Sequence, residues 1–88
     1  MKNKVLVKIY SVEINKQYDV FIPVNDYIWK VKKLILKCIS DLNGEILDIN
    51  KEYALINMNN GRVYKRNEIV KDTDIRNATV LVLYEIKM

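Results

Sequence analysis

Residues 4–10 alternate apolar and polar side chains with a period of two, and so do residues 18–23. This period is typical of a β-strand that buries one of its faces. Residues 13–16 separate the two stretches and favour a turn, so the pattern predicts a β-hairpin. Pro23 ends the second stretch and cannot donate to a neighbouring strand, which predicts that this strand lies at an edge of the sheet.

Apolar side chains then recur every three or four residues, after two good N-cap residues, Asn25 and Asp26. The spacing predicts a helix that starts near Tyr27. It ends at Asn43-Gly44, because glycine readily adopts the left-handed conformation of a helix C-cap. The stripe expected to face the core contains Ile28, Val31, Leu34, Ile35, Cys38, Ile39 and Leu42.

A second hairpin is predicted around Asn60-Gly61, because Asn-Gly favours the positive dihedral angles of a two-residue turn. Its strands are residues 53–58 and 62–65. With this turn, the expected register places two residues on the sheet face away from the helix, namely Leu55 and Tyr64.

The remaining segments are a connector, a loop and a last strand. The connector 45–50 is expected to be held against the core by Ile46, Leu47 and Ile49. The polar stretch 67–77 indicates a tucked loop, anchored by Ile69, Val70 and Ile75. Residues 79–84 are almost continuously apolar, which is typical of a strand inside a sheet. The resulting ββαβββ order predicts an α+β fold, in which one helix packs on one face of a mixed five-stranded sheet.

The composition fits a single folded domain over residues 1–88, with 50% hydrophobic and 30% charged residues. Cys38 is the only cysteine and cannot form an internal disulfide, so a reducing compartment, the cytoplasm, is expected. The uninterrupted apolar runs are far shorter than the roughly 20 residues that cross a bilayer. We therefore expect a protein that does not itself span the membrane.

The residue types exclude most familiar catalytic sites. The sequence has no histidine and one cysteine, so it offers no His-based acid/base pair, no Cys/His nucleophile and no cysteine-rich metal cage. Carboxylate pairs such as Asp72 and Asp74 lack companion ligands and are better explained as solvated loop charge. We expect no enzyme activity, no cofactor, no metal and no small-molecule substrate.

Two segments carry a resemblance to a known fold. The helix opening Asn25-Asp26-Tyr27-Ile28 is similar to the Ser-Asp-Thr-Ile segment of ubiquitin-like proteins. Before the last strand, Asp72-Thr73-Asp74-Ile75 is similar to the isoleucine-ended loop of the same family. Over nearly its whole length the chain thus resembles the β-grasp fold of ubiquitin, which implies that the first, third and last strands are neighbours.

Within that superfamily the chain resembles the YukD/EsaB proteins, small ubiquitin-like components of type VII (ESX or Ess) secretion systems of Gram-positive bacteria. The resemblance is carried by Tyr18-Asp19-Val20, Ile22-Pro23-Val24, Asp26-Tyr27, Val31-Lys32-Lys33-Leu34-Ile35 and the segment 53–64. It implies a non-enzymatic binding or regulatory subunit whose partner is a cytoplasmic part of a membrane secretion subunit. A WXG100-type substrate or an FtsK-like ATPase encoded beside the chain would support this assignment.

Conjugation of the kind that ubiquitin undergoes is not expected. The sequence ends Tyr84-Glu85-Ile86-Lys87-Met88 without a Gly-Gly tail, and Gly44 and Gly61 are its only glycines. Two alternatives stay open: an unrelated ubiquitin-like adaptor, and a small basic regulator that binds nucleic acid through its lysine-rich helix. The net charge of +4 is moderate, and no RNA- or DNA-binding motif accompanies it, so nucleic acid is the less favoured partner.

The main candidate binding surface is the sheet face that one helix leaves uncovered. Its expected partner-binding residues are Leu6, Lys8, Leu55, Tyr64, Val82 and Tyr84. Lys8 would lie at the rim of this patch and provide charge complementarity. The alternative explanation is that small mixed sheets generally leave some apolar side chains exposed.

A second candidate surface lies on the side of the helix away from its apolar stripe. Trp29 and Leu36 are seven residues apart and would form an exposed ridge between Lys32 and Lys33. Such a ridge would suit an acidic, apolar partner, since tryptophan is enriched at binding hot spots. Alternatively, Trp29 packs over the helix start or on a loop.

Overall fold

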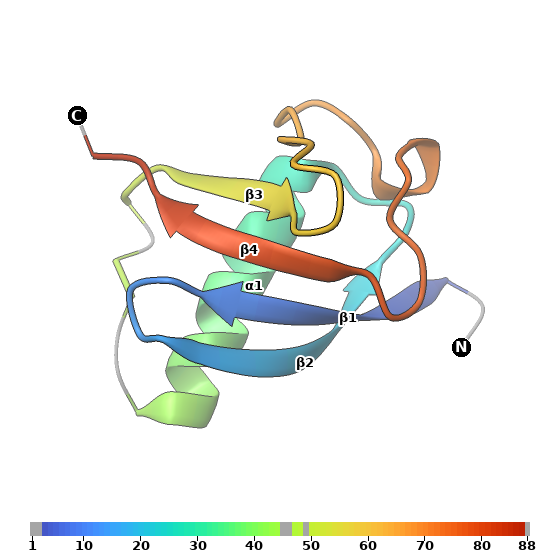
Figure 1. Cartoon of the computed structure of the whole chain (residues 1–88). Helices are drawn as coiled ribbons and strands as arrows, with labels where there is room; N and C mark the ends of the chain where they lie inside the picture. The colour runs from blue at the N-terminus through green and yellow to red at the C-terminus, as the bar shows by residue number, and fades with distance from the viewer. Residues whose placement is uncertain (1–2, 45–46, 49, 88) are drawn as a thin grey trace.

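A four-stranded mixed sheet with one helix across one of its faces makes up the fold in our computed structural model, which describes residues 3–44, 47–48 and 50–87 (Figure 1). The elements in chain order are β1 (Lys4–Ser11), β2 (Lys16–Pro23), α1 (Ile28–Asn43), β3 (Tyr53–Asn57), the 3₁₀ helix η1 (Val70–Asp72) and β4 (Val80–Glu85). The strand order is β2-β1-β4-β3, and β1 and β4 run parallel while the other two pairs are antiparallel. The adjacency of β1, β4 and β3 is the one that the resemblance to the β-grasp fold implies.

The N-terminal hairpin and the position of β4 confirm the sequence predictions. β1 and β2 pair along their full lengths, from Lys4 opposite Pro23 to Ser11 opposite Lys16. Pro23 thus ends an edge strand, where its missing N–H costs no ladder hydrogen bond. β4 lies between β1 and β3 in the sheet interior, as its apolar sequence predicts.

The prediction of a fifth strand is wrong. Residues 62–65 form only an isolated bridge, in which Val63 faces Ile56 of β3. The turn before them is longer than predicted, because the backbone of Asn57 pairs with both Gly61 and Arg62. The chain then leaves the sheet and runs toward η1, so the described residues form four strands.

Leu55 and Tyr64 face the core, which corrects the expectation that they lie on the uncovered face. Leu55 is 0% exposed and lies opposite Leu83 of β4, while Tyr64 is 3% exposed. The pattern was ambiguous because β3 has apolar residues on both faces and a polar residue, Asn57, on the buried one. Asn57 is tolerated there because its side-chain amide donates to the Tyr64 hydroxyl at 3.1 Å.

Helix α1 begins without the predicted side-chain cap. Its N-cap residue is Tyr27, and no side-chain hydrogen bond caps it. Instead, the backbone amides of Ile28 and Trp29 donate to the carbonyl oxygens of Glu68 and Arg66, at 2.8 and 3.1 Å. A distant backbone segment therefore satisfies the free amides that Asn25 or Asp26 was expected to satisfy.

The C-terminal end of the helix agrees with the prediction. Gly44 is the C-cap, with a left-handed φ of 70°, and its amide donates to the Ser40 carbonyl at 3.1 Å. The buried face of the helix, however, is shifted around its axis relative to the predicted stripe. Ile28, Val31, Ile35 and Ile39 are buried, but Leu42 is 68% exposed and Leu36 is only 2% exposed.

Leu36 is buried because the chain after the helix returns along that side of α1. Leu36 lines a hollow together with the segment 50–53, which leads into β3. Two residues of the predicted stripe, Leu34 and Cys38, are only half-buried. Cys38 still packs against the core, so it is a peripheral rather than a fully buried thiol.

The two irregular segments are anchored largely as expected. Val70 and Ile75 of the 67–77 loop are 0% and 1% exposed, and Ile69 is half-buried. In the connector, Leu47 is 9% exposed and belongs to the core. The expected contacts of Ile46 and Ile49 lie outside the described residues.

Candidate functional site

The sheet face opposite α1 carries a continuous row of apolar side chains. Tyr10 of β1 lies directly beside Val82 of β4, and Val82 lies beside Ile56 of β3. Ile56 in turn faces Val63 across the isolated bridge. Side chains directly opposite each other on one sheet face are close enough to touch, so these four residues form one strip, the sheet-face row.

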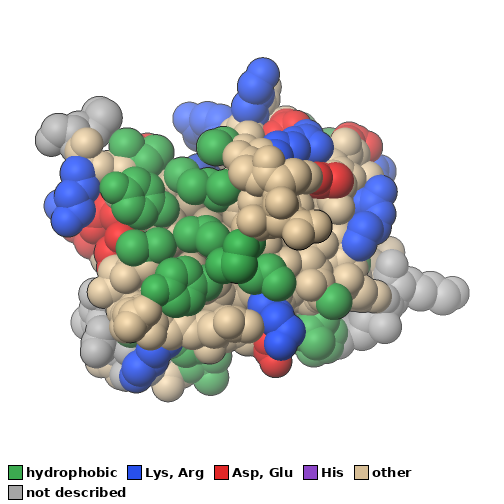
Figure 2. Space-filling model, viewed as in Figure 1, with side chains coloured by type: hydrophobic (Ala, Val, Ile, Leu, Met, Phe, Trp, Pro, Cys, Tyr) green, Lys and Arg blue, Asp and Glu red, His purple; other side chains and the backbone are tan. Residues whose placement is uncertain are grey.

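The sheet-face row is accessible to solvent. Tyr10, Ile56 and Val82 are half-buried and Val63 is 57% exposed. Tyr84, two residues after Val82 on the same face of β4, extends the sheet-face row and is 46% exposed. Figure 2 shows hydrophobic side chains gathered on this face over β1, β3 and β4. The structure thus brings Val82 and Tyr84 together as predicted, with Tyr10, Ile56 and Val63 as their neighbours.

Leu6 and Lys8 lie on the same face, but toward the other end of β1. Lys8 lies beside Val80 and opposite Asp19, and Leu6 lies opposite Phe21. A hollow of about 360 Å³ lies at this end, lined by Leu6, Lys8, Asp19, Asn77 and Ala78. Lys8 is therefore at the rim of the apolar strip, as predicted, and Leu6 extends it toward the edge strand.

The sheet-face row differs from the predicted patch for a reason of register. Ile56 takes the position that was assigned to Leu55, because β3 alternates in the opposite sense to the prediction. Tyr10 belongs to the row because the parallel register places it beside Val82. Asn59-Asn60-Gly61 also permits a turn longer than two residues. Only a prediction of that longer turn would have paired Ile56 with Val63 and placed both on the uncovered face.

The four residues of the second candidate surface also come together. Trp29, Lys32, Lys33 and Leu36 line one hollow of about 320 Å³, which we call the helix-side hollow. The segment 50–53 and Arg66 form its other walls. Leu36 is buried in the core and forms no exposed ridge, and Trp29 is half-buried. The surface is thus a depression, whereas a ridge was expected.

Positive charge is concentrated in the helix-side hollow. The Lys32 ammonium donates to the Tyr53 carbonyl at 2.9 Å. Burial lowers the pKa of Lys32, Glu52 partly opposes that effect, and the nearby Arg66 lowers the pKa further. The Trp29 ring has the ammonium groups of Lys30 and Lys33 at 5.6 and 5.5 Å from its centroid, within the range of cation–π attraction.

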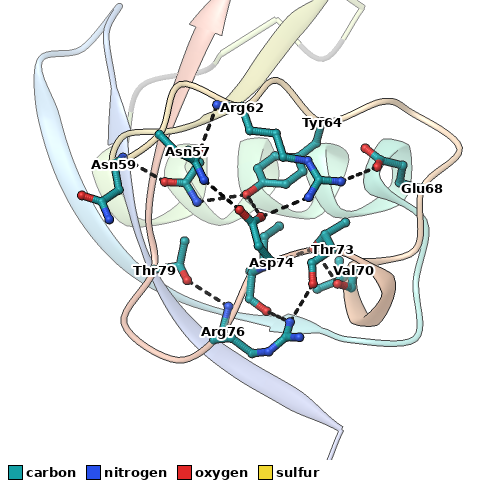
Figure 3. Close-up of polar contacts among 12 residues, drawn as sticks. Asn57, Asn59, Arg62, Tyr64, Glu68, Val70, Thr73, Asp74, Arg76 and Thr79 are labelled. Carbon is teal, nitrogen blue, oxygen red and sulfur yellow. Dashed lines mark hydrogen bonds and ion pairs between the residues drawn. The ribbon is translucent and has the colours of Figure 1, made fainter.

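A polar network beside the core fixes the chain between β3 and β4 (Figure 3). Its centre is Asp74, which accepts hydrogen bonds from the Tyr64 hydroxyl and, at 2.9 Å, from the Asn60 amide. The Arg62 guanidinium lies over the Tyr64 ring, 3.6 Å from Asp74, and donates to Glu68 at 2.7 Å. Every member of this network has a partner inside the chain, which is typical of a structural role.

The pKa directions agree with that interpretation. Hydrogen bonds from Tyr64 and Asn60 lower the pKa of Asp74, and a backbone hydrogen bond from Lys65 lowers that of Glu68. Burial and the hydrogen bond to Asp74 raise the pKa of Tyr64 to about 12. The phenol therefore stays protonated and the two carboxylates stay ionised at neutral pH, so none of them is poised for proton transfer.

Across 3–44, 47–48 and 50–87, no three His, Cys, Asp or Glu side chains gather where they could hold a metal ion. The single α-helix of that part of the chain is too short and too polar to span a membrane.

Sequence comparisons with known proteins find no relative. No family model matches the chain, and no curated protein matches it in sequence.

Comparison with solved structures does find similar folds. The EccD5 ubiquitin-like domain from Mycobacterium xenopi superposes with a TM-score of 0.70 at 14% identity, covering 97% of both chains. The C-terminal ubiquitin-like domain of human 2'-5'-oligoadenylate synthetase-like protein gives 0.69 at 19% identity, covering 100% of this chain and 90% of that one. A chain of the MycP5-free ESX-5 inner membrane complex gives 0.69 at 16% identity, covering 96% of this chain.

These likenesses show that the chain has a ubiquitin-like β-grasp fold. The chain spans only 21% of the length of its counterpart in the ESX-5 complex. The likeness there is to one domain of a larger protein. At such identities the fold is the shared property.

Proposed function

We propose that the protein is a non-enzymatic, ubiquitin-like protein-interaction subunit of a type VII secretion system, related to YukD/EsaB. The sheet-face row carries this proposal. Tyr10, Val82, Ile56 and Val63 form an apolar strip across β1, β4, β3 and the bridge that follows β3. Contiguous exposed apolar surface on a small protein marks an interaction site more often than isolated apolar residues do.

The secretion assignment draws on the fold neighbours. Two of them are a domain of EccD5 and a chain of the ESX-5 inner membrane complex. An unrelated human ubiquitin-like domain superposes equally well, so the fold alone does not favour secretion over another adaptor role. The YukD/EsaB-like residues, including Tyr18-Asp19-Val20 and Ile22-Pro23-Val24, add the preference for secretion.

The proposed partner is a cytoplasmic domain of a membrane-embedded secretion subunit. The protein would bind it from the cytoplasm by non-covalent contact, and this contact would recruit it to the inner side of the membrane. Lys8 and Asp19, which lie opposite each other beside the sheet-face row, would set the orientation of the partner.

Binding between purified components tests the proposal. The ligand is the cytoplasmic domain of a membrane secretion subunit encoded beside this chain, and the readout is the Kd. Tyr84→Asp and Val63→Asp each place a charge on the row at residues that are 46% and 57% exposed, so both variants should fold normally. We expect each to weaken binding by about tenfold or more, as at interface hot spots.

Leu42→Asp is the matched control, because Leu42 is 68% exposed on the helix, away from the sheet face. It should bind like the parent protein. Equal binding by the parent and both row variants would refute the use of this face. Absence of binding to every secretion subunit tested, with a different protein captured through the same row, would favour the general adaptor function.

A further inference from the structure

The helix-side hollow holds three cations that form no ion pair within the described residues. Lys32, Lys33 and Arg66 line it, and none of the three forms an ion pair in that part of the chain. The fourth lining cation, Lys51, lies 3.9 Å from Glu85. By contrast, Arg62 in the polar network pairs with both Glu68 and Asp74. Four cationic side chains thus gather around one hollow, and three of them form no ion pair within the described residues.

Two of these cations are held close to each other by the fold. Lys32 is fixed by its hydrogen bond to the Tyr53 carbonyl, and the backbone of Arg66 is fixed by the bond from the Trp29 amide. The two positive charges repel each other, and among the described lining residues Glu52 is the only acidic one. An anion placed beside both cations would relieve this repulsion, so the hollow has a preformed preference for negative charge.

The hollow also has an apolar wall. The half-buried Trp29 ring and the buried Leu36 side chain lie beside the cations. The ammonium groups of Lys30 and Lys33 lie 5.6 and 5.5 Å from the centroid of the Trp29 ring, which adds positive charge beside the indole. A partly exposed indole is a good platform for an apolar or aromatic side chain of a ligand.

We propose that the helix-side hollow binds an acidic segment of a protein partner, with a carboxylate beside Lys32 and Arg66 and an apolar side chain of the same segment against Trp29. This site is separate from the sheet-face row, which lies on the opposite face of the sheet from α1. The protein can therefore contact two protein segments at once.

A protein segment fits this hollow better than a nucleic acid does. Single-stranded nucleic acids are usually bound along a groove with several stacking aromatic side chains. Among its lining residues the hollow has one indole and one buried phenol, Tyr53, and its volume of about 320 Å³ suits a few side chains. Glu52 in its wall would also repel a continuous phosphate backbone.

Fluorescence of Trp29, the only tryptophan of the chain, reports binding at this site directly. The probes are a short synthetic peptide of glutamates around one phenylalanine and its analogue with glutamine in place of each glutamate. We expect a saturable change in emission with the acidic peptide and about tenfold weaker binding of the glutamine analogue. Arg66→Glu and Lys33→Glu should each weaken binding of the acidic peptide by about tenfold.

Lys37→Glu is the matched control, since Lys37 is an exposed lysine of the same helix that does not line the hollow. It should change the Kd by less than about twofold. If Lys37→Glu weakened peptide binding as much as Arg66→Glu and Lys33→Glu do, the net charge of the protein would explain the loss, and the proposal would be overturned. The absence of a saturable change, or tighter binding of a single-stranded oligonucleotide than of the peptide, would also overturn it.

Two further measurements separate this inference from the proposed function. Circular dichroism checks whether each variant is folded. Because Lys33 is exposed, Lys33→Glu keeps the test decisive even if Arg66→Glu unfolds. The row variant Tyr84→Asp should bind the peptide normally. If Tyr84→Asp loses binding to the secretion subunit but keeps the peptide, the defect lies in the sheet-face row. If Arg66→Glu loses the peptide but keeps the secretion subunit, the defect lies in the helix-side hollow.

Discussion

Tyr64 and Asp74 show how one side-chain pair can fix a long irregular segment. Tyr64 lies on the core side of the chain after β3, and Asp74 lies in the loop before β4. Their hydrogen bond, with the amide of Asn57 on the other side of the hydroxyl, ties both segments to the sheet. The sequence shows these residues only as an isolated tyrosine and a loop carboxylate, because the bond joins residues that are 10 positions apart.

The stability of the fold should fall at acid pH through this network. The folded-state pKa of Asp74 and Glu68 is lowered, so their contribution is present above their ordinary pKa values of 3.8 and 4.5. It is lost as the pH falls from there through the lower folded values. Urea unfolding from pH 7 to pH 2 measures this. Asp74→Asn should flatten the acid limb, and an unchanged limb would contradict the assignment.

At alkaline pH the same network predicts that the fold loses stability as the pH rises. The pKa of Tyr64 is raised from 10.0 to about 12, so its contribution is complete below pH 10. It declines as the pH rises toward 12, because the unfolded chain releases the phenol proton first. Unfolding of the parent and of Tyr64→Phe, compared between pH 9 and 12, isolates this group. The parent should lose more stability than the variant over that interval.

The inward position of Leu55 is testable by truncation. Leu55 is 0% exposed opposite Leu83, so Leu55→Ala should lower the free energy of unfolding by roughly 2–5 kcal/mol. Leu42→Ala, at an exposed position of α1, should change it by less than about 0.5 kcal/mol. Chemical denaturation measures both values. If Leu55→Ala lowered the free energy of unfolding only slightly, the result would support an outward-facing Leu55 instead.

At the scale of elements, helix α1 is defined locally at one end and by tertiary contacts at the other. Gly44 ends the helix in the left-handed conformation that the sequence predicts. The start depends on the Glu68 and Arg66 carbonyls, which no local pattern contains. The helix face that is buried is likewise set by the chain on both sides of α1, which explains why Leu36 is buried and Leu42 is not.

Gly44→Ala tests the local end of the helix. A Cβ at Gly44 would meet no atom within 4 Å, so any cost comes from the φ of 70° alone. We expect a loss of about 1 kcal/mol in the free energy of unfolding. Gly44→Asn should lose less, because asparagine tolerates this conformation better. Thermal unfolding of the three proteins ranks them, and equal stability of all three would contradict the argument.

At the scale of the whole molecule, the β-grasp arrangement leaves two surfaces of different chemistry, and we propose that both bind protein partners. The sheet-face row is apolar, whereas the helix-side hollow is cationic with an aromatic wall. Their different chemistry predicts different responses to salt. Raising the ionic strength from about 0.05 to 0.5 M should weaken acidic-peptide binding at the hollow several-fold, while capture through the row should change little. Titrations at both salt concentrations check this, and a parallel response would mean that one surface serves both ligands.

The sequence by itself determined the N-terminal hairpin, the helix that follows it, the edge and central strands and the left-handed helix end. Each of these depends on neighbouring residues: a period of two or of three to four, a proline without an N–H, a glycine with free φ. The same local information pointed to Val82, Tyr84, Trp29 and Lys33 as candidates for binding.

Only the tertiary structure decided which faces are buried. Both faces of β3 are apolar, so the choice between Leu55 and Ile56 depends on pairing with β4 and on the hydrogen bond that allows Asn57 to be buried. The fifth strand is absent because Tyr64 binds Asp74 in the core-side network and the chain turns away from β3. Which strand face is buried and where the sheet ends depend on contacts between residues far apart in the sequence. The local spacing of apolar residues carries no information about the energies of those contacts.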